Sequence, residues 1–198
     1  MSNRIRYDSL LVHYLAVALD ERLFRRRIEA LALEPDRRRA TLVLGDESLV
    51  LDLHPTSGAV LLGPAPTPEG TVRLARRTTV TRVVAPPDER VLIVELSAAG
   101  SQAGRPKRLV VELLGNQYNL LVLDPADRIL VALWKRSAGE RELRPGARYV
   151  PPPPTDRLGA ETPIGPEEWR ALLGPVPPPE RKRTLIEKIA WTSPSNAE

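Results

Sequence analysis

Short segments of alternating apolar and polar residues fill the chain from residue 27 to residue 134 and constrain the fold more than any other feature. An apolar side chain at every second residue is typical of a half-buried β-strand. Turn-forming proline, glycine, asparagine and aspartate separate the segments. We therefore expect strands near residues 27–34, 39–45, 48–54, 58–62, 79–85, 90–97, 107–114, 118–124 and 128–134.

One amphipathic helix precedes these strands. Apolar residues recur at steps of three and four between Asp8 and Phe24, which predicts a helix with one buried face. Either Asp8 or Ser9 offers the short side-chain oxygen that caps a helix N-terminus. One leading helix followed by eight or nine short strands predicts an α+β, mainly β chain, built as a β-sandwich or barrel.

The strand segments also repeat. A shift of 52 residues places 28–44 over 80–96, and a shift of 60 places 49–53 over 109–113. Each half then forms two successive hairpins. Two stacked four-stranded sheets bury the apolar faces that neither sheet buries alone. We interpret residues 1–150 as one domain, a two-copy β-sandwich.

A cluster of prolines marks the end of this domain. Of the 21 prolines, 11 fall within residues 145–179, and four are consecutive at 151–154. Consecutive prolines favour polyproline II and cannot pair as an interior strand. We expect a proline-rich linker at 151–179, with a short helix at 166–173. Residues 180–198 then look like the beginning of a second helical unit that the chain does not complete.

The composition restricts the class of protein. The chain has no cysteine, so it forms no disulfide and offers no thiolate ligand, which fits a reducing compartment. Its first residues lack the apolar segment of a signal peptide, and it contains no run of 18 apolar residues. We expect a cytoplasmic protein with no membrane partner.

The sequence contains no recognisable catalytic motif. His13 and His54 have no second ligand at a metal-binding spacing, which favours packing and turn roles. A phosphate-binding glycine loop, HExxH and GxSxG are all missing. We therefore expect a protein that is not an enzyme, with no catalytic residue, no metal and no cofactor.

Basic residues gather in several turns. Residues 1–150 hold 23 basic and 18 acidic residues, a net charge of +5, and arginines cluster at 25–27, 37–39 and 105–108. Turns that meet at one end of a sandwich would form a phosphate-binding surface. Arginines also solubilise turns and strand edges without binding anything. The sequence alone leaves both interpretations open.

Four stretches resemble one family, in the right order along nearly the whole chain. They are 7–11 at the start of the helix, 111–124 in a strand pair, 144–149 before the prolines, and 185–198. These stretches are similar to the NFACT-N domain of fibronectin-binding protein A-like proteins, which are ribosome-quality-control factors. The resemblance implies a fold similar to the N-terminal domain of formamidopyrimidine DNA glycosylases. It also implies that residues 180–198 are the start of a truncated helix-hairpin-helix domain. Ser9 stands where the family usually has glycine.

The resemblance also implies a function. Members of this family bind the obstructed large ribosomal subunit with its rRNA, tRNA and the nascent chain–tRNA complex. In bacteria they support C-terminal alanine tailing of the stalled chain. We therefore expect an RNA-binding module of such a factor. The sequence leaves open its tRNA preference, its tailing activity and its oligomeric state.

The resemblance further implies RNA-binding residues. The family's aspartate before the first helix maps to Asp8, and we include Asn119 from the strand pair. The family's aspartate–arginine pair falls on Asp88-Glu89-Arg90, so the pair is either Glu89 with Arg90 or Asp88 with Arg90. A carboxylate beside an arginine orients it for bidentate phosphate binding. Asp8 also fits a helix cap, and Asp88 a turn.

Two other functions stay open. A glycosylase-like DNA-binding or repair protein shares the expected helix and sandwich, but Met1 and Ser2 do not supply the N-terminal proline and glutamate of such enzymes. A fibronectin-binding surface adhesin agrees with the family name. The missing signal peptide argues against that role.

Overall fold

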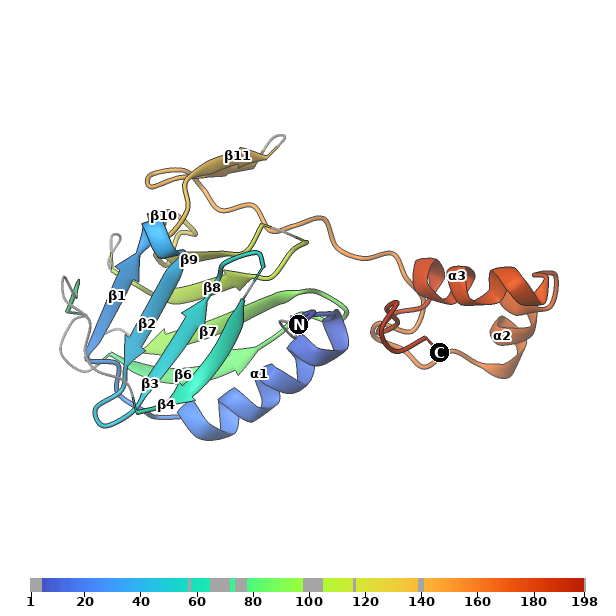
Figure 1. Cartoon of the computed structure of the whole chain (residues 1–198), viewed down its shortest axis with the longest axis horizontal. Coiled ribbons are helices and arrows are strands. Elements are labelled where there is room, and N and C mark those ends of the chain that lie inside the picture. Colours follow the sequence, from blue (N-terminus) through green and yellow to red (C-terminus); the bar gives the residue numbers. More distant parts are fainter. Residues whose placement is uncertain are drawn as a thin grey trace.

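The computed structural model describes residues 5–56, 58–64, 72–73, 78–97, 105–115, 117–138 and 141–197. Figure 1 shows a β-rich body joined by an extended segment to two short helices. The predicted α+β, mainly β class is confirmed. Asn116 and Glu198, from the stretches that carry the family resemblance, lie outside the described residues.

Helix α1 (Ser9–Leu23) leads into two five-stranded antiparallel sheets. The first sheet has the order β4-β3-β2-β1-β5, the second β10-β9-β8-β7-β6, and β11 pairs with β12 as a separate hairpin. The strands are β1 (Ala30–Glu34), β2 (Arg39–Val43), β3 (Ser48–Asp52), β4 (Ala59–Gly63), β5 (Val72–Arg73), β6 (Thr79–Val84), β7 (Val91–Ser97), β8 (Arg108–Glu112), β9 (Asn119–Leu123), β10 (Ile129–Ala132), β11 (Arg136–Ala138) and β12 (Arg141–Leu143).

All nine predicted strands are present, as β1 to β4 and β6 to β10. Three further strands, β5, β11 and β12, were not predicted, because two or three residues are too few to show a period. Each sheet has one strand more than the four expected. The first sheet gains β5 beside β1, and the second gains β10 beside β9.

The two-copy architecture is confirmed in the pairing of the strands. Pairs in the first sheet recur in the second after the shifts of 52 and 60 residues that align the two sequences. The matched pairs are Leu31–Leu42 with Val83–Val94, Ala40–Leu51 with Leu92–Val111, and Val50–Leu61 with Val110–Leu121. Such agreement in register follows from the same alternation of buried side chains in both copies.

The main core lies between the two sheets and α1. Leu42 and Leu51 enter it from the first sheet, Leu92 and Leu120 from the second, and Val12 from α1. Each of these residues is at most 1% exposed. Fully burying such a side chain stabilises the fold by about 2 kcal/mol. Neither sheet nor the helix buries this surface alone.

A second, smaller core covers the outer face of the second sheet. Val110 and Leu121 pack there against Leu143 of the β11–β12 hairpin and against Tyr149. Strands of this sheet are therefore buried on both faces. This explains the uninterrupted apolar run 120–123, because a strand buried on both sides needs no polar alternation.

Glu112 attaches the start of the proline-rich segment to this sheet. Its side chain is fully buried and forms ion pairs with Arg141 and Arg136. The Tyr149 hydroxyl donates a hydrogen bond to Glu112 Oε1 at 3.0 Å. Burial, with the nearby Glu112 carboxylate, raises the pKa of Tyr149 well above its usual range. The Tyr149 hydroxyl therefore stays a donor and holds the segment to β8.

The chain then leaves the sandwich as an extended strap, residues 150–157. Helix α2 (Pro166–Leu173) lies within the predicted linker, and helix α3 (Pro178–Lys188) follows it. Leu158 pairs with Ile189 in an isolated parallel bridge, which returns the end of α3 to the strap. No helix in the described ranges is both long enough and apolar enough to span a membrane.

Candidate functional site

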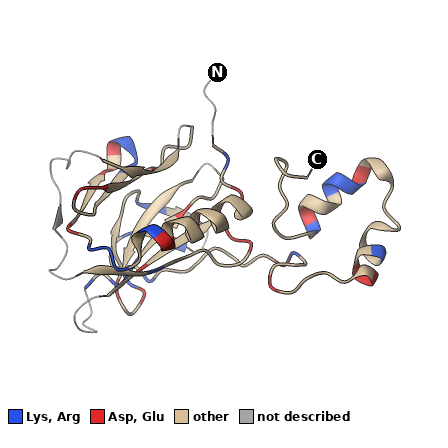
Figure 2. Ribbon diagram, turned by 90° about the horizontal axis from the view of Figure 1, so that it is seen from below, with Lys and Arg blue, Asp and Glu red and all other residues tan. Residues whose placement is uncertain are grey.

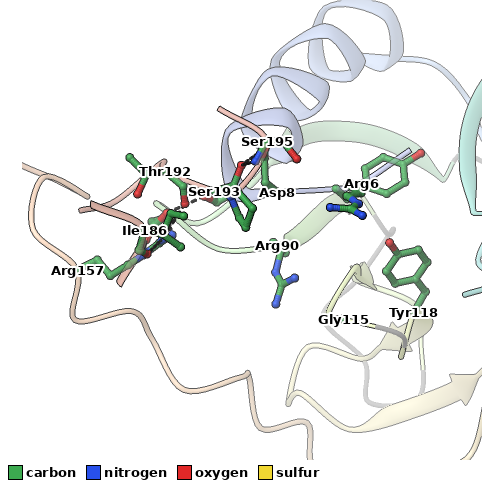
Figure 3. A pocket seen from close by; sticks show the side chains of 14 residues that line it. Arg6, Asp8, Arg90, Gly115, Tyr118, Arg157, Ile186, Thr192, Ser193 and Ser195 are labelled. Atoms are coloured by element: carbon green, nitrogen blue, oxygen red, sulfur yellow. Dashed lines mark hydrogen bonds and ion pairs between the residues drawn. The ribbon is translucent and has the colours of Figure 1, made fainter. Parts of the chain in front are cut away.

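A cleft of about 500 Å³ lies where the C-terminal segment, residues 158–197, meets the sandwich. Its walls come from the start of α1, the turn between β6 and β7, and the turn between β8 and β9. The strap and the residues after α3 complete it (Figure 3). Segments far apart in the sequence therefore build this cleft together.

Asp8 joins the start of α1 to the C-terminal segment. Its Oδ1 accepts a hydrogen bond from the Leu11 backbone N–H at 2.8 Å, so Asp8, rather than Ser9, is the N-cap. Its Oδ2 accepts a hydrogen bond from Ser193 Oγ at 2.7 Å. Both carboxylate oxygens of Asp8 therefore already have partners within the chain.

Asp88 is the centre of a larger network. Its side chain is fully buried, and Arg157 binds it through two hydrogen bonds, Nε to Oδ2 at 2.7 Å and Nη2 to Oδ1 at 2.5 Å. Asp88 Oδ1 also accepts hydrogen bonds from Ser9 Oγ at 2.6 Å and the Trp191 backbone N–H at 2.8 Å. This carboxylate thus connects α1, the strap and the residues after α3.

The network keeps Asp88 ionised. Burial acts to raise the pKa of Asp88, because a charged carboxylate loses hydration. Hydrogen bonds from Arg157, Ser9 and Trp191 outweigh that effect and lower the pKa below its ordinary value. The ion pair with Arg157 is therefore intact at neutral pH.

The sequence did not indicate that Arg157 belongs to the site. Besides binding Asp88, its Nη1 donates to the carbonyl oxygens of Ile186 and Thr192, both at 2.9 Å. The only sequence signal is its place after four prolines, where a stiff segment delivers a side chain to a defined position. Its partner Asp88 lies 69 residues earlier, so no local pattern predicts the pair.

Glu89 and Arg90 differ in their surroundings. Glu89 Oε1 accepts a hydrogen bond from the Thr155 backbone N–H at 2.9 Å, and burial raises the pKa of Glu89. Arg90 is exposed and lines the cleft, as does Arg6 (Figure 3). Within the described residues, no hydrogen bond or ion pair holds either guanidinium. Neither pairing expected for Arg90, with Glu89 or with Asp88, forms a hydrogen bond.

Asn119 lies apart from the other predicted residues. It begins β9 and is fully buried. Its Nδ2 donates to the Trp134 carbonyl oxygen, and its Oδ1 accepts from the Trp134 N–H, both at 2.9 Å. Asn119 therefore connects β9 to the residues after β10. In this arrangement its side chain has no surface on which RNA can bind.

Two tyrosines form the floor of the cleft on the sandwich side. The rings of Tyr7 and Tyr118 meet edge to face with centroids 6.0 Å apart, and both residues are buried. The Tyr7 hydroxyl accepts a hydrogen bond from the Val60 N–H at 2.9 Å. Packing therefore holds both rings, and this hydrogen bond also holds Tyr7.

The arginine clusters of the other turns are mostly paired with neighbouring side chains. Arg26 Nη2 lies 3.1 Å from Asp46 Oδ1, and Arg38 stacks on Trp134 with its Cζ 3.9 Å from the ring centroid. Further ion pairs join Arg37 to Glu34, Arg39 to Asp52 and Arg108 to Asp127. Figure 2 shows basic and acidic residues scattered over the sandwich and the helices. For these clusters the structural interpretation is the better one.

The histidines have the packing and turn roles predicted for them. The His13 ring lies edge-on to Trp191 with centroids 5.2 Å apart, and His54 Nδ1 is 2.8 Å from the Thr56 hydroxyl. The described residues contain no group of three or more histidine, cysteine, aspartate or glutamate side chains that fits a metal ion.

Comparison with known proteins agrees with the family resemblance. Residues 74–198 match the family described as NFACT N-terminal and middle domains. No curated protein matches the chain.

Several solved structures are similar in fold. The N-terminal domain of fibronectin-binding protein PavA from Streptococcus pneumoniae has 20% identity and a TM-score of 0.74, over 96% of this chain and 77% of that one. The N-terminal part of a Streptococcus suis fibronectin/fibrinogen-binding protein has 18% identity and the same TM-score of 0.74, over 96% and 77%. A Staphylococcus aureus fibrinogen-binding protein has 16% identity and a TM-score of 0.66, over 98% and 73%.

Proposed function

This chain belongs to the family of NFACT N-terminal and middle domains, and we propose that it is an RNA-binding module of a ribosome-quality-control factor. The module binds the obstructed large ribosomal subunit and tRNA, including the nascent chain–tRNA complex, and supports alanine tailing of the stalled chain. It acts in the cytoplasm by binding and positioning, without a catalytic site of its own.

The observation that carries this proposal is the pair of exposed arginines in the cleft, Arg6 and Arg90. Many other arginines of the described chain are paired with a carboxylate or an aromatic ring. A guanidinium that makes no hydrogen bond within the chain can direct its planar set of N–H donors at a phosphate group. Two of them in one cleft favour a partner rich in phosphate.

The carboxylates have a different role in this proposal. The family resemblance assigns RNA contacts to Asp8 and Asp88, yet intramolecular hydrogen bonds use the oxygens of both. We therefore assign them to the shape of the cleft, since they hold the C-terminal segment against α1 and the β6–β7 turn. Arg6 and Arg90 make the RNA contacts.

A binding experiment with matched variants tests this assignment. Affinity for deacylated tRNA and for large ribosomal subunits is measured over a salt series for the native chain and for the double variant Arg6→Gln/Arg90→Gln. Losing two phosphate contacts is expected to flatten the log–log salt dependence by about 1.4 for a single-stranded contact region. The control is Arg170→Gln/Arg181→Gln, which removes two exposed charges from α2 and α3.

The same preparations test the two rival functions. Equal salt slopes for the cleft variant and the native chain would reject the cleft as the RNA site. Saturable binding to immobilised fibronectin or fibrinogen, without RNA binding, would favour an adhesin. Base excision from damaged duplex DNA would favour a glycosylase-like repair protein.

A further inference from the structure

Arg128 and Arg148 lie directly opposite each other across an isolated antiparallel bridge. The bridge is flanked by the hydrogen bonds Ile129 N–H to Ala147 O at 2.9 Å and Tyr149 N–H to Asp127 O at 2.7 Å. This pattern makes Arg128 and Arg148 a non-hydrogen-bonded pair, whose Cα atoms are about 4.5 Å apart and whose side chains leave on the same face. Both side chains are exposed.

Like charges placed directly opposite each other destabilise a strand pair. Within the described residues, no hydrogen bond or ion pair holds the guanidinium of Arg128 or Arg148. The carboxylate of Asp127, the residue before Arg128, is paired with Arg108. Two adjacent cations are therefore left without an acidic partner, although the neighbouring arginine has one.

Hydrogen bonds hold the backbone on both sides of this pair. Asp124 Oδ1 accepts hydrogen bonds from the N–H groups of Ala126 at 2.8 Å and Arg128 at 2.9 Å, which pin the turn before β10. On the other side, the hydrogen bond from Tyr149 to buried Glu112 holds the residue after Arg148. The two side chains therefore start from defined positions.

The two arginines border an open hollow of about 660 Å³, which Pro125, Ala126 and Gly146 also line. Gly146 adopts φ +88°, and a Cβ there would meet only open space. The hollow lies at the β9–β10 turn, whereas the cleft lies at the β6–β7 and β8–β9 turns. These turns are at opposite ends of the second sheet, roughly 15 Å apart for five-residue strands.

We propose that Arg128 and Arg148 form a second phosphate-binding site, which takes phosphodiester groups of an RNA strand. This inference rests on the proposed function and extends it. One phosphate between the two guanidinium groups offsets their mutual repulsion, and its oxygens accept hydrogen bonds from the N–H groups of both. Because cleft and hollow lie at opposite ends of one sheet, a single RNA molecule contacts the sandwich at two separate places.

The test compares three double variants of the full chain. These are Arg128→Gln/Arg148→Gln, Arg6→Gln/Arg90→Gln, and the matched control Arg170→Gln/Arg181→Gln. The probes are deacylated tRNA, a fluorescein-labelled 20-nucleotide RNA, and inorganic phosphate followed by amide chemical shifts. For the hollow variant we expect a log–log salt slope shallower by about 1.4, and affinity for the oligonucleotide lower by roughly 20-fold at 0.1 M salt.

Each outcome separates the hollow from the cleft. A native salt slope in the hollow variant, together with a flattened slope in the cleft variant, overturns this inference and leaves the proposed function standing. A flattened slope in the hollow variant, together with a native slope in the cleft variant, supports phosphate binding in the hollow and rejects the cleft as an RNA site. Inorganic phosphate that saturates the hollow, with RNA affinity unchanged in the hollow variant, overturns RNA as the ligand.

Discussion

The two copies of the sandwich carry turns at equivalent sequence positions, but the side chains of the two turns have different partners. In the first copy, at Pro35 to Arg39, Asp36 is exposed and Arg38 stacks on the Trp134 ring at 3.9 Å. In the second copy, 52 residues later, Asp88 is buried in an ion pair with Arg157, and Arg90 lies open in the cleft. Equivalent positions thus hold an aspartate and an arginine in both copies, but among the described residues it is the turn of the second copy that lines the cleft.

The neighbours of the two turns account for the difference. Helix α1 packs on β6 and β7, the strands that flank the second turn, and the C-terminal segment then packs against the start of α1. The turn backbones also differ. The first contains a 3₁₀ turn followed by Arg38 at φ +50°, whereas the second has Asp88 itself at φ +55°. A repeated strand pattern therefore conserves the scaffold, while the cleft depends on what packs beside it.

The largest expected effect comes from removing the buried carboxylate. Asp88→Ala leaves the guanidinium of Arg157, only 20% exposed, without its counter-charge. We expect the free energy of unfolding to fall by about 3 kcal/mol. Urea denaturation followed by tryptophan fluorescence measures the change. The equivalent change in the first copy, Asp36→Ala, is expected to stay within about 0.5 kcal/mol of the native chain. Equal losses in both variants would remove the distinction between the turns.

The next effect concerns a direct contact between the copies. Gly58 and Tyr118 are equivalent positions under the shift of 60, and a Cβ on Gly58 would lie 2.7 Å from Tyr118 Cε2. We expect Gly58→Ala to destabilise the fold by about 2 kcal/mol through overpacking. Gly63→Ala is the control, since a Cβ there has no atom within 4 Å. An unchanged melting temperature in Gly58→Ala would show that the Tyr118 ring moves freely.

A third comparison concerns the equivalent arginines Arg38 and Arg90. We expect the first to affect stability and the second to affect RNA binding. Arg38→Gln loses the contact with the Trp134 ring and is expected to cost about 1 kcal/mol of stability, with RNA affinity unchanged. Arg90→Gln is expected to keep its stability within about 0.5 kcal/mol and to lose RNA affinity. Thermal unfolding and tRNA binding are measured on both. Loss of RNA affinity in Arg38→Gln alone would place the RNA contact on the first copy.

The smallest effect is a dependence on pH. Because its folded pKa lies below the ordinary value of 3.8, Asp88 stabilises the fold fully above that pH and loses this contribution as pH falls through the folded pKa. The stability difference between the native chain and Asp88→Asn is therefore expected to be constant from pH 7 to about pH 4 and to shrink below it. Melting temperatures at pH 7, 5, 4 and 3 test this. A difference that shrinks above pH 5 would contradict it.

Features with a local period were predictable from the sequence. The alternating segments placed the nine longer strands, and the spacing of apolar residues placed α1, because both patterns repeat within a few residues. The two-residue strand β5 and the hairpin β11–β12 have no such period. Asn119 has a polar side chain within an apolar run, and its sequence does not distinguish a buried hydrogen bond to Trp134 from an RNA contact.

The sequence by itself therefore determined the sandwich and its two copies, and it narrowed the helix cap to Asp8 or Ser9, since these depend on neighbours within one or two strands. Only the tertiary structure decided that the second copy carries the cleft. The deciding contacts join Asp88 to Arg157 across 69 residues and Asp8 to Ser193 across 185. No periodicity encodes such pairs, because their geometry exists only after the strap has brought the C-terminal segment back to the sandwich.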